Sequence, residues 1–285
     1  MKIYVPQPIP AVALERLRSL GEVTVFDHLD RLLPPGELRT AVADQHILFA
    51  LGGIEYDAEL IDGVADLGLI AAMHVSPAFV DITAATRRGI PVSGIPNTGL
   101  AKTTAEFTFA LLMATAWRLP EADTFLRGGR WIQNQSEAFL GTRLYGKTLG
   151  IVGLGAIGTD VAVKARACDM NVVYYKRTPL SRAEEIALGA EYRSLEDLFR
   201  ESDFVALTPP LTAQTKGLVG ADLIGLMKPS AILLNTSRGQ VLDEVALEDA
   251  LVSGRIRGAG LDVFQWEGLP DPGPRDRLKE LPNVV

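Results

Sequence analysis

Three glycines in the middle of the chain have the spacing of a turn that binds a dinucleotide. The cluster Gly153-Leu154-Gly155-Ala156-Ile157-Gly158 directly follows the apolar run Leu149 to Val152. The first glycine allows a tight turn, the second lets the backbone approach a pyrophosphate, and the third packs a helix against the strand. The helix then directs its N–H groups and the positive end of its dipole at the anion. About half the chain precedes this cluster, so a different domain must come first.

Two cations stand where an acid would select NAD. An NAD site usually has a carboxylate about 20 residues past the glycines, which binds the ribose 2′-hydroxyl. Here Lys176-Arg177-Thr178 follows the next strand-like run. An ammonium and a bidentate guanidinium suit an adenosine 2′-phosphate. We therefore expect NADP to be preferred to NAD, and the alternative interpretation is a solvated basic turn.

Two later strand-like runs end in further polar residues. Asn235-Thr236-Ser237-Arg238-Gly239 follows one run, and Asp262 and Glu267 follow the next. An arginine beside a nicotinamide ring can hold a substrate carboxylate and polarise its keto group, although a lone arginine can equally cap carbonyls. A carboxylate such as Glu267 can orient a histidine that donates a proton, although taken alone it is more simply a surface carboxylate.

Strand-like runs alternate with helix-like stretches in both halves of the chain, which predicts parallel sheets with helices on both faces. The runs cover residues 2–5, 23–26, 47–51, 69–75 and 90–93, and then 149–152, 171–175, 204–207, 231–235 and 258–263. Between the two sets, Thr103-Thr104-Ala105-Glu106 has the pattern of a capping box and predicts a helix that reaches about Leu119. Because this helix is apolar nearly all round, we expect it to be buried and to cross domains or contact a subunit.

Bulk properties exclude several classes of protein. The length of 285 residues suffices for two domains, and the net charge of −7 argues against nucleic acid as a partner. Cys168 is the only cysteine, which rules out an internal disulfide and suits the reducing cytoplasm. The most apolar stretch, Phe107 to Trp117, is shorter than the ~20 residues that cross a bilayer. We expect no membrane and no metal site.

The motifs, taken in order, resemble the D-isomer-specific 2-hydroxyacid dehydrogenase family from about Leu48 to Val285. This resemblance implies a flavodoxin-like α/β substrate domain over residues 1–98, followed by a Rossmann-type NAD(P)-binding domain with a doubly wound parallel sheet over 99–285. It also implies a homodimer, because relatives pair through the long helix and the loop after it. The matching pieces are Arg88-Gly89-Ile90-Pro91-Val92, Ala105-Glu106, the run from Gly146 to Gly158, Pro210-Leu211-Thr212 with Thr215, Asn235 to Gly239, and Gly260-Leu261-Asp262-Val263-Phe264 with Glu267.

The resemblance also implies site roles. Arg238 matches the arginine that binds and polarises the substrate, Glu267 the acid that pairs with the catalytic histidine, and Asp262 the carboxylate that holds the nicotinamide amide. Leu51-Gly52-Gly53 falls where the family offers backbone N–H groups to the substrate carboxylate. The implied reaction is hydride transfer between the nicotinamide and a small 2-oxo acid such as glyoxylate or hydroxypyruvate. Thr208, Pro209, Thr236 and Ser237 fall where the family touches the cofactor.

Two segments depart from the family pattern. The family histidine lies just beyond a Pro-Asn-Val-type strand, and this sequence stops at Leu281-Pro282-Asn283-Val284-Val285, so we expect a truncated chain that lacks part of its substrate domain and binds cofactor better than it turns over substrate. The three histidines, His28, His46 and His74, match no family motif. The segment Val75 to Asp81 replaces a Gly-x-Asp-type turn, which leaves the substrate open.

Two other functions remain open. Phe139-Leu140-Gly141-Thr142 and Phe264 to Glu267 are similar to phosphite dehydrogenase, a family member, although the lysine that binds its substrate is missing near Val75. A protein that senses NAD(P), resembling the family's transcriptional corepressors, would keep the arginine and the glutamate as well. Such a sensor would need a peptide-binding groove in the first domain, for which the sequence gives no sign.

Overall fold

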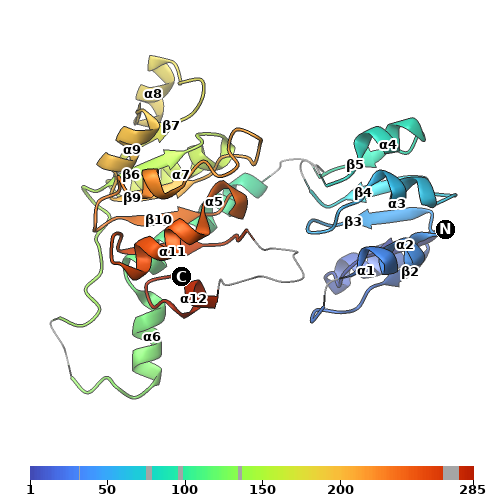
Figure 1. Cartoon of the computed structure of the whole chain (residues 1–285), viewed down its shortest axis with the longest axis horizontal. Helices are drawn as coiled ribbons and strands as arrows, with labels where there is room; N and C mark the ends of the chain where they lie inside the picture. Colours follow the sequence, from blue (N-terminus) through green and yellow to red (C-terminus); the bar gives the residue numbers. More distant parts are fainter. Residues whose placement is uncertain (32, 75–78, 96–98, 134–136, 266–275) are drawn as a thin grey trace. The chain divides into compact units, whose positions relative to one another are not determined.

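The computed structural model describes residues 1–31, 33–74, 79–95, 99–133, 137–265 and 276–285 (Figure 1). The chain divides into two compact units. Among the described residues, 1–95 belong to the first unit, whereas 99–265 and 276–285 belong to the second. Each unit is an α/β structure built on one parallel sheet.

The first unit has five parallel strands in the order β2-β1-β3-β4-β5. This order is that of flavodoxin-like folds, which confirms the predicted fold class. The strands are β1 (Lys2–Val5), β2 (Glu22–Val25), β3 (Ile47–Ala50), β4 (Leu69–Ala72) and β5 (Val92–Ser93), and the helices are α1 (Ala11–Arg18), α2 (Pro35–Val42), α3 (Ala58–Gly63) and α4 (Ile82–Arg87).

Local signals explain two of these helices. Asp57 precedes α3 and accepts a hydrogen bond from the Leu60 amide, and Asp81 does the same for α4 from the Ala84 amide. Such N-caps satisfy amide groups that have no partner inside the helix. The apolar faces of these helices then pack on the sheet in one buried cluster, which includes Leu48 and Ile70 of its central strands.

The second unit has six parallel strands in the order β11-β10-β9-β6-β7-β8. Counted from its own first strand, this is the order 3-2-1-4-5-6 of Rossmann-type domains. The strands are β6 (Thr148–Val152), β7 (Asn171–Tyr175), β8 (Ala190–Tyr192), β9 (Phe204–Leu207), β10 (Ile232–Asn235) and β11 (Gly258–Leu261). The helices are α5 (Leu100–Ala116), α6 (Leu119–Arg127), α7 (Ala156–Ala167), α8 (Arg182–Leu188), α9 (Leu195–Glu201), α10 (Ala221–Ile224), α11 (Glu244–Val252) and α12 (Asp276–Glu280), with a 3-10 turn at Gly239–Val241.

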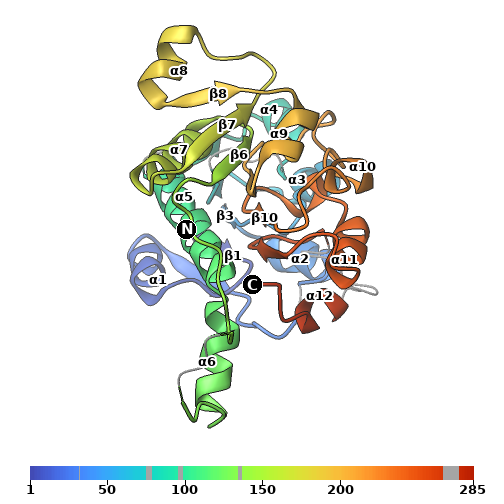
Figure 2. The same cartoon turned by 90° about the vertical axis from the view of Figure 1, so that its left-hand side faces the viewer.

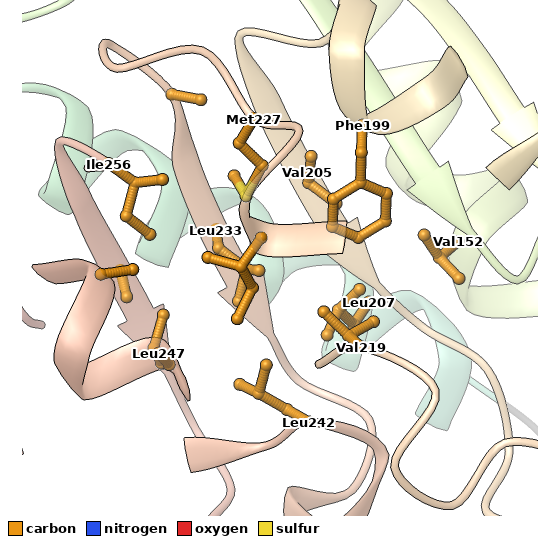
Figure 3. Packing of buried hydrophobic residues seen from close by; sticks show 14 of the residues in the cluster. Val152, Phe199, Val205, Leu207, Val219, Met227, Leu233, Leu242, Leu247 and Ile256 are labelled. Atoms are coloured by element: carbon orange, nitrogen blue, oxygen red, sulfur yellow. The ribbon is translucent and has the colours of Figure 1, made fainter. Parts of the chain in front are cut away.

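The central strands of the second sheet are buried on both faces. Successive side chains of a strand point to opposite faces, so each strand supplies two cores. Val205 and Leu207 of β9 join Leu233 of β10 and Phe199 of α9 in one cluster (Figure 3). The intervening residue Ala206 belongs to the cluster on the other face, which contains residues of α5 and α7. Burial on both sides explains why these strands read as continuous apolar runs.

The N-terminus of α5 differs from the prediction. The helix begins after Gly99, which has a φ of +82°, and the Thr103 hydroxyl donates to the Gly99 carbonyl at 3.2 Å. Thr103 therefore lies inside the first turn, and the predicted capping box is wrong. The helix is also less buried than expected, because Phe107 is 48% exposed and Trp117 is 45% exposed.

Helix α6 projects away from the second sheet (Figure 2). It begins after Arg118, whose φ of +53° turns the chain at the end of α5. Its side chains Leu119 and Leu126 are 54% and 58% exposed, and Trp131 in the segment that follows is 57% exposed. This unit thus presents apolar side chains to its surroundings on α6 and just after it.

A buried carboxylate ties together the amino ends of the second sheet. Asp203, just before β9, accepts a hydrogen bond from the Thr148 amide at 3.0 Å and lies 3.2 Å from the Lys228 Nζ and 3.4 Å from the Lys147 Nζ. Burial acts to raise the pKa of Asp203, but the amide and the two lysines together hold it below its ordinary value. The ionised form of Asp203 therefore stabilises the folded unit.

In the described part of the chain, no helix combines the length and the apolar character that are needed to cross a membrane.

Candidate functional site

The register of the second sheet places most of the predicted site residues at one edge. Five of its six strands, taken in the order β7, β6, β9, β10 and β11, end in one continuous row of paired residues. The row is Tyr175, Val152, Leu207, Asn235 and Leu261. Each strand is followed at this carboxyl edge by a residue that the sequence singled out. In the same order these residues are Lys176, Gly153, Thr208, Thr236 and Asp262.

The glycine cluster lies where the strand order reverses. Strands β6 and β9 are neighbours, and the chain leaves them in opposite directions along the sheet. Such a switch point opens a crevice at the carboxyl ends of the strands, where α/β proteins bind ligands. Gly153 follows β6, and Thr208 and Pro209 follow β9. The tertiary fold thus supplies the context that the motif alone lacked.

Close packing requires two of the three glycines. Gly153 has a φ of +96°, and a Cβ there would lie 2.7 Å from the backbone N and Cα of Pro209. A Cβ on Gly158 would lie 2.6 Å from the Gly153 carbonyl oxygen, so the third glycine lets α7 pack against the end of β6. The Thr208 hydroxyl donates to that same carbonyl at 2.8 Å and fixes the turn.

Gly155 differs from the other two glycines because open space surrounds it. Among the described residues, no atom lies within 4 Å of the position that a Cβ would take there. Gly155 precedes α7, and no described side chain caps this end of the helix. The first turn therefore presents the amides of Ala156, Ile157 and Gly158 without a side-chain acceptor. This arrangement fits the pyrophosphate of a dinucleotide.

The basic pair after β7 lies in a supported turn. Lys176 is half-buried, Arg177 and Thr178 are exposed, and neither cation forms an ion pair with another described residue. The buried Tyr174 supports the turn, because its hydroxyl accepts from the Leu180 amide at 2.8 Å and bonds Glu185 at 3.1 Å. Both cations thus have charge available for an anionic ligand.

A buried asparagine builds the turn that carries Arg238. The Asn235 side-chain oxygen accepts from the Ser237 amide at 3.1 Å and from the Ser237 hydroxyl at 2.9 Å, while its amide nitrogen donates to the Arg238 carbonyl at 3.2 Å. Asn235 is fully buried, whereas Arg238 is exposed and donates to the Ser237 carbonyl at 2.6 Å. The turn therefore holds the arginine backbone rigidly and leaves much of its side chain accessible.

The hydroxyl of Thr236 is used inside the protein. It lies 2.7 Å from the Thr108 hydroxyl of α5, and both residues are buried. Because the Thr108 hydroxyl also lies 2.8 Å from the Thr104 carbonyl, we assign Thr108 as the donor to that carbonyl and Thr236 as the donor to Thr108. Thr208 and Ser237 likewise bond within the fold, so the backbones of these residues are better placed to meet a ligand than their side chains.

The loops after β10 and β11 pack tightly on each other. A Cβ on Gly239 would lie 2.0 Å from the Phe264 carbonyl carbon, and the Gln265 amide donates to the buried Glu244 of α11. The sequence pattern did not indicate that these residues support the site. A glycine directly after the arginine was the only local signal that could have indicated such a close approach.

Asp262 stands at the end of β11, and its amide donates to the Asn235 carbonyl at 3.0 Å. Partial desolvation raises the pKa of its carboxyl above the ordinary value, although the residue remains exposed. The predicted Glu267 lies outside the described residues.

In the first unit, the predicted loop Leu51-Gly52-Gly53 follows β3. The Leu51 amide donates to the Tyr56 hydroxyl at 3.1 Å. Gly52 and Gly53 are exposed, and Gly53 has a φ of +85° that favours glycine. The amides of Gly52 and Gly53, rather than that of Leu51, are therefore the candidate donors of this loop.

The histidines occupy separate places. The His46 Nδ1 accepts from the Lys2 amide at 3.1 Å, and the His28 ring packs 4.8 Å from that of Phe26. His74 follows β4, and its ring lies edge-on to Phe79 at 5.7 Å. The predicted substrate-facing residues 75–78 lie outside the described part of the chain. Within that part, no group of three His, Cys, Asp or Glu side chains is placed to hold a metal ion.

Comparison with known proteins decides the family. The model of the D-isomer specific 2-hydroxyacid dehydrogenase NAD binding domain matches residues 109–285, which include the glycine cluster and Arg238. The chain belongs to this family. Membership confirms the function predicted from the sequence, NAD(P)-dependent oxidoreduction of 2-hydroxy acids and 2-oxo acids. The matched domain assigns the binding of a nicotinamide cofactor to the second unit.

Relatives resemble the chain along its whole length. The glyoxylate reductase of Thermococcus kodakarensis is 43% identical over 288 residues, which cover 100% of this chain and 84% of that protein. The glyoxylate reductase of Pyrococcus furiosus is 41% identical with the same coverage. Among solved structures, the TT0316 protein from Thermus thermophilus has a TM-score of 0.89 and 41% identity, and the match covers 100% of this chain and 88% of that one.

A more distant structure contains a bound cofactor. An acyclic imino acid reductase, solved in complex with NADPH and D-Arg, matches with a TM-score of 0.78 and 28% identity, covering 100% of this chain and 88% of that one. A reductase named for imino acids therefore has a fold similar to that of this chain.

Proposed function

We propose that this family member reduces a small 2-oxo acid of the glyoxylate or hydroxypyruvate type to its 2-hydroxy acid, and that it prefers NADPH to NADH. The observation that carries the proposal is the row of strand ends at the switch point, where the glycine cluster, Thr208, Arg238 and Asp262 follow neighbouring strands of one sheet. The substrate class is supported by relatives named glyoxylate reductase that are 43% and 41% identical.

The second unit would hold the cofactor along this row. The turn at Gly153 and Gly155 and the amides of Ala156, Ile157 and Gly158 would bind the pyrophosphate. The backbones of Thr208, Pro209, Thr236 and Ser237 would line the adjoining edge, and Asp262 would accept from the nicotinamide carboxamide. When bound, the reduced nicotinamide supplies a hydride to the substrate carbon.

The preference for NADPH rests on Lys176 and Arg177. Neither side chain is paired with a carboxylate in the described part of the chain, so their charges are available to a 2′-phosphate. With Thr178 they would form a site of three hydrogen-bonding side chains after β7. A bidentate guanidinium beside an ammonium favours a phosphate over a hydroxyl.

The substrate would be held by charge and by backbone donors. Arg238 would bind the substrate carboxylate and draw electron density from the keto oxygen, which lowers the barrier for reduction of the adjacent carbon. In the first unit, the amides of Gly52 and Gly53 would donate to a substrate carboxylate. Glu267 would orient the imidazole of the family's catalytic histidine, which donates the proton.

The proposed assembly is a homodimer that buries α6 and the segment after it. The exposed fractions of its apolar side chains support this proposal, because exposed apolar surface of this kind marks contact surfaces. The residues are Leu119, Leu126, Trp131, Ile132 and Leu140, which are 54%, 58%, 57%, 87% and 59% exposed. Light scattering on a purified sample should give twice the mass of 30.7 kDa.

A steady-state assay tests the proposed reaction. The full-length gene product is purified and mixed with NADPH or NADH and with glyoxylate, hydroxypyruvate or pyruvate in turn, and separately with NADP⁺ or NAD⁺ and phosphite. We expect oxidation of the cofactor that depends on a 2-oxo acid, with a lower KM for NADPH than for NADH. Arg238→Ala should abolish turnover and keep cofactor binding, and Arg238→Lys should retain part of the activity because it keeps the charge without the bidentate geometry.

Two results would contradict the proposal. Reduction of NADP by phosphite, without turnover of any 2-oxo acid, would establish phosphite oxidation instead. Tight binding of the cofactor with turnover of none of these substrates would favour a nucleotide-sensing protein.

A further inference from the structure

A buried tyrosine lies directly beneath the Leu51–Gly53 loop of the first unit. Tyr56 is 0% exposed, and its hydroxyl reaches back five residues along the chain to Leu51. The hydroxyl accepts a hydrogen bond from the Leu51 amide at 3.1 Å and lies 3.4 Å from the Leu51 carbonyl oxygen, to which it donates. One phenol therefore binds both backbone polar groups of Leu51.

Tyr56 itself is anchored independently of its hydroxyl. Its amide donates to the Phe79 carbonyl at 2.8 Å, and its carbonyl accepts from the Asp81 amide at 2.9 Å. Its ring lies 5.8 Å from that of Phe79. Backbone and ring thus join Tyr56 to the segment after β4, and its hydroxyl bonds the loop after β3.

The two hydrogen bonds between the Tyr56 hydroxyl and the Leu51 backbone, which we call the clasp, leave the tip of the loop exposed. Leu51 is 1% exposed, whereas Gly52 and Gly53 are both exposed, with no described atom within 4 Å of where either Cβ would lie. Burial raises the pKa of the Tyr56 hydroxyl, so it remains a protonated donor throughout the physiological range. The loop therefore has one rigid end at Leu51 and an accessible end at the two glycines.

We infer that Tyr56 is a positioning residue for the substrate, whose hydroxyl fixes the Leu51 peptide and thereby orients the amides of Gly52 and Gly53 toward the carboxylate of a 2-oxo acid. This inference rests on the proposed function and deepens it. If the hydroxyl is removed, the buried amide and carbonyl of Leu51 lose their partner, and the loop must shift to satisfy them with water. The tip glycines shift with it, although no group that touches the substrate has been altered.

Tyr56→Phe tests the inference, because it keeps the ring and removes only the clasp. We expect the KM for the 2-oxo acid to rise about tenfold, since each factor of ten corresponds to about 1.4 kcal/mol of lost binding. The KM for the cofactor should stay unchanged, and kcat should change by less than about twofold, because the hydroxyl touches no reacting atom. A merely structural role would lower thermal stability without separating the two KM values.

Thr115→Val is the control. It removes another buried hydroxyl that bonds a backbone group, the Leu111 carbonyl at 2.8 Å, but in helix α5 of the second unit and away from the residues proposed to bind cofactor or substrate. It should lower stability and leave the KM for the 2-oxo acid unchanged. A rise in that KM with Thr115→Val equal to the rise with Tyr56→Phe would overturn the inference, since the effect would then be general destabilisation.

Amide hydrogen exchange of Leu51, measured by NMR, tests the clasp without any turnover. The Leu51 amide should be protected in the wild type and should exchange at least about tenfold faster in Tyr56→Phe. A Leu51 amide that is unprotected in the wild type, or equally protected in both proteins, overturns the inference whatever the activity.

The two proposals fail in different ways. If the wild type turns over a 2-oxo acid and Tyr56→Phe exposes the Leu51 amide without raising the KM, the positioning role is wrong and the proposed function stands. If the wild type neither turns over a 2-oxo acid nor binds oxamate, an unreactive analogue, the proposed function fails. The positioning role then falls with it, even where hydrogen exchange reports the clasp.

Discussion

The roles of Gly153 and Gly155, the first and second glycines of the cluster, can be distinguished by replacing each with alanine, which adds one methyl group. Gly155 has a φ of −95°, which any residue adopts, and its Cβ position is open among the described residues. Gly153 has a φ of +96°, and its Cβ position lies 2.7 Å from the Pro209 backbone. The same added methyl therefore has a different effect at each position.

Gly153→Ala should destabilise the second unit. A left-handed conformation costs an L-residue about 1–2 kcal/mol, and the overlap with Pro209 adds about 1–3 kcal/mol. Alanine restricts the unfolded chain, which offsets about 0.4–1 kcal/mol. We expect a net loss of about 1–5 kcal/mol in the free energy of unfolding.

Gly155→Ala should keep or slightly raise stability, by up to about 1 kcal/mol, because only the term from the unfolded chain remains. Its methyl group would instead project where the proposed pyrophosphate approaches the backbone. We expect NADPH to bind at least about tenfold more weakly, or about 1.4 kcal/mol.

Two measurements on each variant decide the matter. Trp117 and Trp131 lie in the second unit, so urea unfolding followed by tryptophan fluorescence reports on that unit. Titration with NADPH, followed by its own fluorescence, gives the affinity. Equal stability of the two variants would refute the strain argument, and wild-type affinity in Gly155→Ala would refute the placement of the pyrophosphate.

Three further outcomes follow from the second unit. Replacing Lys176 and Arg177 together by alanine should weaken NADPH binding by about 2–3 kcal/mol, because each substitution removes a charged hydrogen bond to the 2′-phosphate. NADH binding should be nearly unaffected. Equal losses for both cofactors in a titration would remove the basis of the NADPH preference. Because the folded-state pKa of Asp203 is lowered from 3.8, its contribution to stability is complete above that value and is lost as the pH falls through the lowered pKa. Asp203→Asn should therefore flatten the acid side of the unfolding profile and cost about 1–3 kcal/mol at pH 7, and an unchanged profile would contradict this assignment. Gly239→Ala should lower the melting temperature and the activity together, because its Cβ would lie 2.0 Å from the backbone after β11; calorimetry that shows wild-type stability would mean that the two loops are not packed as described.

Local patterns in the sequence were enough to predict much of the fold. Strands at 171–175 and 204–207 have the bounds that their apolar runs predicted. Asp243, a residue type that favours the N-cap position, caps α11 by accepting from the Val245 and Ala246 amides. These features depend on the chemistry of a few neighbouring residues, namely side-chain apolarity and one short-range hydrogen bond. The glycine cluster could be recognised in the sequence for the same reason, since its turn is local.

Local patterns failed where a more distant partner decided the structure. Strand β8 is three residues long with two exposed positions, and it exists because it pairs with β7. The pattern at Thr103 matched a capping box, but Gly99 begins the helix one turn earlier. Short or ambiguous segments are settled by hydrogen bonds and packing from elsewhere in the chain.

The sequence by itself determined which residues are candidates for the chemistry, because glycine spacing, an arginine and carboxylates after strands are properties of residue type and order. Only the tertiary structure decided how these residues are supported. The continuous register of the second sheet brings residues from 153 to 262 to one edge, since parallel strands that are paired residue by residue must end together. The clasp of Tyr56 on Leu51 and the contact of Gly239 with Phe264 join residues that no spacing rule connects, because they depend on the path of the chain between them.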